Sequence, residues 1–85
     1  MHKMTEPQLR EYDQAGAITA ARIVRTAEGY VLVINVNWKE GDLTVYSQRN
    51  KPRAWRSLDR LIGHLEALTS IRQIEVFFSE KSDPP

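Results

Sequence analysis

The segment from Tyr30 to Trp38 constrains the fold more than any other part of the chain, because every second residue from Tyr30 to Trp38 is apolar, whereas the residues between them are mixed. Successive side chains of a β-strand point to opposite faces of a sheet, so this pattern predicts a strand with one wholly apolar face directed at the core. That face comprises Tyr30, Leu32, Ile34, Val36 and Trp38. Trp38, the last of them, is expected in the core or at its rim.

Two further strands flank this segment. Residues 17–26 are rich in β-branched side chains, and residues 43–48 alternate Leu43 and Val45 with polar or aromatic residues. Both connections, "AEG" and "KEGD", place a glycine after a glutamate, at Gly29 and Gly41. Glycine accepts the positive φ that short hairpin loops require. The sequence therefore predicts a three-stranded antiparallel meander.

A short helix is expected before the meander, over residues 5–16. Thr5 is a suitable N-cap, Gly16 a suitable stop, and Leu9 and Tyr12 are the expected anchors.

A second helix is expected to begin after Ser57, with Asp59 at its positive end. Apolar residues then follow at spacings of three and four, which is the strongest helix signal in the chain. They are Leu58, Leu61, Ile62, Leu65 and Leu68. Residues 71–79 complete the pattern as a fourth strand.

The predicted fold class is therefore α+β, in the order α–β–β–β–α–β, as a two-layer α/β sandwich of one domain over residues 1–85. The crossover helix directs the fourth strand parallel to the first and third, and either outer strand could be its neighbour. Residues 1–4 and 80–85 are expected to be loosely ordered, since both ends are polar.

Composition narrows the function classes. The chain has 85 residues and no cysteine, which excludes disulfides and thiolate metal sites. Its longest apolar run, residues 30–34, is far shorter than the roughly 20 residues that span a bilayer, and the N-terminus lacks an apolar signal core. These observations favour a cytoplasmic protein that does not associate with membranes.

Catalysis has little support in the sequence. The two histidines are His2, near the N-terminus, and His64, which is expected to be a solvated residue on the polar side of the second helix. No metal-ligand spacing or phosphate-binding loop is present, and no cofactor is indicated. We therefore expect a protein that is not an enzyme.

The charge is concentrated in one segment. Residues 49–60 carry five positive charges and one negative charge, whereas the rest of the chain carries seven positive and ten negative charges. A net charge of +1 conceals this polarisation. The five cations are Arg49, Lys51, Arg53, Arg56 and Arg60.

This segment has a functional and a structural interpretation. Guanidinium groups beside the N-terminus of a helix suit contact with the phosphates of DNA or with an acidic partner. Alternatively, the cations only solvate a loop and protect a sheet edge. Trp55 could stack on a base if it were exposed, although burial beneath the second helix is the favoured interpretation.

Phe77 and Phe78 are adjacent in the last predicted strand, so they face opposite sides and one must leave the main core. A homodimer that hides this residue is left open.

Three segments resemble a known family. "LREYDQAGAITAARI" (residues 9–23), "VLVINVNWKEGDLT" (31–44) and "RAWRSLDRL" (53–61) resemble the small plasmid partition-associated proteins of the ParC family. The resemblance implies a bacterial cytoplasmic accessory protein of plasmid or mobile-element partition or maintenance, acting beside DNA or a partner partition protein. It assigns no catalytic or ligand residue.

Two other functions remain open. One is a protein–protein adaptor that docks through a strand edge or the spare phenylalanine and does not bind nucleic acid. The other is double-stranded RNA binding, against which the final strand and the lack of a lysine-rich start to the second helix count.

Overall fold

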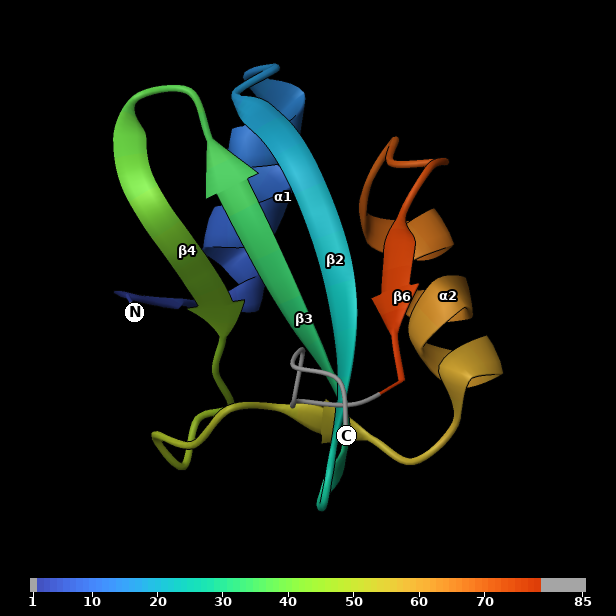
Figure 1. The fold of residues 1–85 in the computed structure, drawn as a ribbon. Helices are drawn as coiled ribbons and strands as arrows, with labels where there is room; N and C mark the ends of the chain where they lie inside the picture. Colours follow the sequence, from blue (N-terminus) through green and yellow to red (C-terminus); the bar gives the residue numbers. More distant parts are fainter. Residues whose placement is uncertain (1, 79–85) are drawn as a thin grey trace.

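The computed structural model describes residues 2–78, which form two helices and a mixed six-stranded sheet (Figure 1). The α+β class is confirmed. Two short strands, β1 and β5, were absent from the predicted order. In chain order the elements are β1 (His2–Met4), α1 (Glu6–Gln14), β2 (Ile18–Thr26), β3 (Gly29–Val36), β4 (Lys39–Val45), β5 (Ala54–Trp55), α2 (Leu58–Leu68) and β6 (Glu75–Phe77).

The antiparallel meander of β2, β3 and β4 forms the centre of the sheet. Gly29, at φ +136°, pairs with Thr26 across the first turn, as expected. The second turn differs from the prediction. Val36 pairs with Lys39, so the turn is at residues 37–38 and the "KEGD" segment belongs to β4.

Trp38 was wrongly assigned to the core or its rim, because the strand ends before it. As a turn residue it is 56% exposed, with its ring edge-on to Tyr12 at 5.4 Å between centroids. Leu32, Ile34 and Val36 of the predicted face belong to the core, as expected. Val31 and Val33 on the opposite face are buried too, so burial along β3 does not alternate.

The outer strands run parallel to their neighbours. β6 pairs with β2, which confirms the expected parallel direction and selects one of the two outer positions. β1 pairs with β4 at the opposite edge. Residues 2–4 are therefore not loosely ordered: Met4 is 1% exposed, and its carbonyl accepts a 2.8 Å hydrogen bond from the N–H of Tyr46. The other segment expected to be loose, 80–85, lies outside the described residues.

β5 pairs with the first residues of β3, outside the part of β3 that pairs with β4. Tyr30 pairs with Trp55 and Val31 with Ala54. This pairing explains why residue 29 is glycine, since a Cβ there would lie 2.5 Å from the carbonyl oxygen of Trp55. A two-residue strand has no periodicity, and the sequence pattern therefore did not reveal it.

Both helices begin where the sequence predicted. The hydroxyl of Thr5 accepts a hydrogen bond from the N–H of Gln8, and that of Ser57 accepts one from the N–H of Arg60. Gly16 has φ +68° just after α1. α1 lies behind the meander and α2 behind β6 in the view of Figure 1.

One core cluster joins both helices to the sheet. Leu9 of α1 and Leu61 and Leu65 of α2 pack with Ile23, Leu32 and other buried residues of the strands. Ile62 was expected in the apolar stripe but is 38% exposed, because it lies at the margin of the buried face.

Both adjacent phenylalanines lie outside the core, whereas only one of them was expected to. Phe77 is 43% exposed and Phe78 is 73% exposed. Val76 is the residue of β6 that packs against the core.

Candidate nucleic-acid interface

A tight loop positions the first two cations of the charged segment. The N–H of Ser47 donates to the carbonyl of Lys51 at 2.8 Å, and the N–H of Asn50 donates to the carbonyl of Ser47 at 3.1 Å. Asn50 adopts φ +62°, a left-handed conformation that asparagine tolerates better than most residues. Beyond the loop, Tyr46 forms a β-bridge with Pro52. The loop thus holds Arg49 and Lys51 at the end of the sheet.

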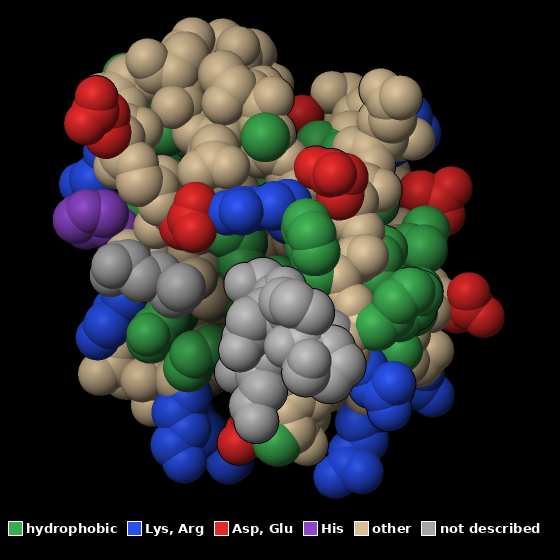
Figure 2. Space-filling model, viewed as in Figure 1, with side chains coloured by type: hydrophobic (Ala, Val, Ile, Leu, Met, Phe, Trp, Pro, Cys, Tyr) green, Lys and Arg blue, Asp and Glu red, His purple; other side chains and the backbone are tan. Residues whose placement is uncertain are grey.

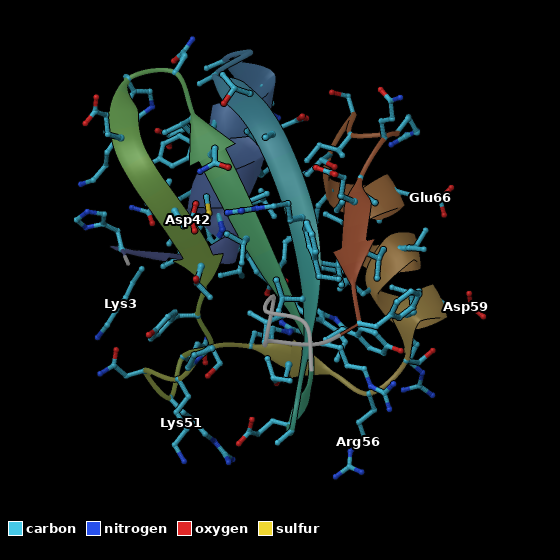
Figure 3. All side chains as sticks on the ribbon, in the orientation of Figure 1. Lys3, Asp42, Lys51, Arg56, Asp59 and Glu66 are labelled. Atoms are coloured by element: carbon cyan, nitrogen blue, oxygen red, sulfur yellow. The ribbon has the colours of Figure 1, made fainter. Side chains whose placement is uncertain are left out.

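We call the five predicted cations the basic rim: Arg49, Lys51, Arg53, Arg56 and Arg60. Four of them are exposed, and within residues 2–78 these four form no ion pair. Figure 3 shows Lys51 and Arg56 projecting from the same end of the molecule. Lys and Arg side chains gather at this end in Figure 2, with an acidic side chain among them.

Arg53 differs from the other four cations. Its Nη1 lies 2.7 Å from Oε1 of Glu6, and its guanidinium lies 4.8 Å from the centroid of the Trp55 ring. Its side chain is 39% exposed. Arg53 therefore fastens the segment before β5 to the first turn of α1, and its charge is already matched by a carboxylate.

Glu6 also contacts His64, through Oε2 and Nε2. One carboxylate thus links α1, the segment before β5, and α2. The expectation that His64 is a solvated helix residue was wrong, since its side chain is 28% exposed and its ring lies 5.5 Å from that of Trp55. Three separate elements meet here, and no spacing within the sequence shows that Glu6 and His64 would be neighbours.

Trp55 belongs to the core. At 8% exposed it packs with the residues of α2 and the sheet, which confirms the favoured interpretation. A ring buried to this extent offers no face on which a base could stack, and Trp55 is therefore removed from the candidate interface.

Two hollows flank Arg53 along the basic rim. The larger, of about 740 Å³, lies between the start of α1 and the loop after β4 and has Arg49, Lys51 and Arg53 in its walls. The smaller, of about 490 Å³, has Arg53, Arg56 and Arg60 in its walls. The two hollows share Arg53 and Ala54, so all five predicted cations border one connected surface.

Two residues beside the rim were missed by sequence reasoning. Lys3 of β1 donates a 2.6 Å hydrogen bond to Asn50, and its ammonium lies 5.2 Å from the centroid of the Tyr46 ring. Tyr46 is half-buried and lines the larger hollow. Only the pairing of β1 with β4 brings Lys3 to this site, and no signal in the first four residues indicates that pairing.

A second carboxylate–arginine pair lies on the sheet, between Arg22 and Asp42 at 2.5 Å. Asn35 also donates a 2.9 Å hydrogen bond to Asp42. The hydrogen bond from Asn35 and the charge of Arg22 outweigh partial burial and hold the pKa of Asp42 below its ordinary value.

Within residues 2–78, no three His, Asp or Glu side chains are grouped so that they could hold a metal ion. The same part of the chain contains no helix long and apolar enough to cross a membrane.

Comparisons with protein-family models, with curated proteins and with solved structures found no match.

Proposed function

We propose that this chain is a non-enzymatic binding protein that contacts nucleic acid through the phosphates, using the basic rim. The observation that carries the proposal is that Arg49, Lys51, Arg56 and Arg60 are exposed and unpaired within residues 2–78 while bordering one connected surface. Guanidinium and ammonium groups that are free of carboxylates are the groups that contact phosphates in protein–nucleic acid interfaces.

The arrangement of the fold is consistent with this use. We infer that α1 and α2 form one layer and the sheet the other, with the basic rim at one end where the β4–β5 connection and the start of α2 meet. Within residues 2–78, neither α1 nor α2 presents a row of base-reading side chains along this rim. Binding would therefore depend on phosphate charge and would show little preference for sequence.

The resemblance to the ParC family supplies a cellular setting for the proposal: a cytoplasmic accessory protein of plasmid or mobile-element partition or maintenance. The partner would be DNA or an acidic surface of a partition protein, since both present closely spaced negative charges. No cofactor is part of this proposal.

Salt dependence tests the proposal directly. Each contacted duplex phosphate contributes roughly −0.9 to the slope of log K against log salt concentration, so four free cations predict a slope of about −3.6. The measurement is fluorescence anisotropy of a labelled duplex at several salt concentrations. A duplex and a single strand that both fail to bind even at low salt would contradict the proposal and favour the adaptor function.

A double charge reversal, Lys51→Glu with Arg56→Glu, should abolish duplex binding, because both side chains project from the rim and form no ion pair within residues 2–78. Lys39→Glu is the matched control for Lys51→Glu: it makes the same change of charge at the first residue of β4, beside the β3–β4 turn at the opposite end of the sheet (Figure 1). Equal losses from Lys51→Glu and Lys39→Glu would show that net charge, and not the rim, governs binding.

A further inference from the structure

The larger hollow contains more than phosphate-binding cations. It is lined by the half-buried residue Tyr46 and two prolines, Pro7 and Pro52, together with the polar residues Ser47 and Gln48. Its volume of about 740 Å³ lies within the range of about 300–1,000 Å³ typical of pockets that bind small organic molecules. A site for phosphate alone requires neither an aromatic ring nor this volume.

Tyr46 is held in place for such a role. Its N–H donates to Met4, it forms a β-bridge with Pro52, and the ammonium of Lys3 lies 5.2 Å from its ring centroid. Lys3 itself is not among the residues that line the hollow. A fixed aromatic ring beside cations is the combination that binds a flat base together with its phosphate.

The cations lie where the phosphates of such a strand would pass. Arg49 and Lys51 border the same hollow as Tyr46, and Arg53 connects it to the hollow bordered by Arg56 and Arg60. A base within a duplex is stacked on both faces and cannot enter a hollow, whereas an unpaired base can turn out of its strand.

We propose that the basic rim takes single-stranded nucleic acid, with one base in the larger hollow against Tyr46 and the flanking phosphates on the cations of the rim. This inference rests on the proposed function and names its substrate class. It assigns to Tyr46 the stacking role that the sequence suggested for Trp55.

The test compares three ligands of similar length: a thymidine oligonucleotide of about 12 residues, an abasic oligonucleotide carrying the same number of phosphates, and a duplex. We expect the thymidine oligonucleotide to bind about fivefold or more tightly than the abasic one, because one stacked base is lost. Tyr46→Leu should lower affinity for the thymidine oligonucleotide by a similar factor and leave that for the abasic one unchanged. Tyr46→Phe, which keeps the ring, should bind as the unaltered protein does.

The outcomes separate this inference from the proposed function. Equal binding of thymidine and abasic oligonucleotides would overturn the inference while leaving phosphate binding intact. Binding of neither oligonucleotide nor duplex would overturn both. The comparison of ligands uses the unaltered protein, so it decides the question even if Tyr46→Leu fails to fold.

Discussion

Five arginines of this protein fall into two groups that the sequence does not distinguish. Arg22 and Arg53 are partly buried and paired with carboxylates, at 2.5 Å to Asp42 and 2.7 Å to Glu6. Arg49, Arg56 and Arg60 are exposed and form no ion pair within residues 2–78.

The contrast is sharpest between Arg53 and Arg56, three residues apart in one charged segment. Arg53 contacts Glu6 and lies over Trp55, whereas Arg56 lies between β5 and α2 and projects into solvent (Figure 3). Arg53 stabilises the contact between α1, the segment before β5 and α2, whereas Arg56 is available to a ligand. Charge density along a sequence therefore overstates the number of cations that can bind.

The largest expected effect is on stability. Arg53→Glu should lower the free energy of unfolding by about 2 kcal/mol, because it removes an ion pair and places a second carboxylate beside Glu6. Arg56→Glu, the same change on an unpaired side chain, should alter it by less than about 0.5 kcal/mol. Urea denaturation measures both. Equal stabilities of the two variants would show that the Glu6 contact contributes nothing.

The second effect is on binding. Glu6→Gln frees the guanidinium of Arg53, so duplex affinity should rise several-fold at low salt and the salt slope should steepen from about −3.6 to about −4.5. Glu66→Gln is the matched control, since Glu66 is exposed on α2 and forms no ion pair within the described part of the chain (Figure 3). If both variants strengthen binding alike, only net charge has changed and Arg53 is not a masked phosphate ligand.

The smallest effect concerns the other paired arginine. The pKa of Asp42 is lowered in the folded state, so its contribution to stability is present above the unfolded value of about 4 and is lost as the pH falls through the folded pKa. Asp42→Asn should lower the free energy of unfolding by less than about 1 kcal/mol at pH 7, since the pair is partly exposed. The variant should also lose less stability than the unaltered protein as the pH falls.

Urea denaturation measured at intervals of about one pH unit between pH 2 and pH 7 checks this prediction. Glu40→Gln is the control on the same strand, where the carboxylate is exposed. If Asp42→Asn and the unaltered protein lose the same free energy of unfolding as the pH falls, Arg22 and Asn35 do not stabilise the folded state through this carboxylate.

The regular elements of the fold were predictable because each carries its own local signal. The alternation of residues 30–36, the apolar spacing of residues 58–68 and the N-caps Thr5 and Ser57 depend only on near neighbours in the chain. Trp38 was misplaced because the apolar pattern continues to residue 38, whereas the strand ends at Val36 and the chain turns at residues 37–38. The basic rim was predictable as a count of charges, and the structure connects its members through two hollows.

The sequence by itself determined the meander, the two helices and their starts, and the concentration of positive charge after the third long strand. Only the tertiary structure decided which cations are free, because Glu6, Arg53 and His64 are brought together by elements far apart in the chain. It also decided that Trp55 is buried and that Lys3 and Tyr46 adjoin the rim. Contacts between distant segments depend on packing and on the pairing of two- and three-residue strands, and such strands are too short to leave a periodic pattern.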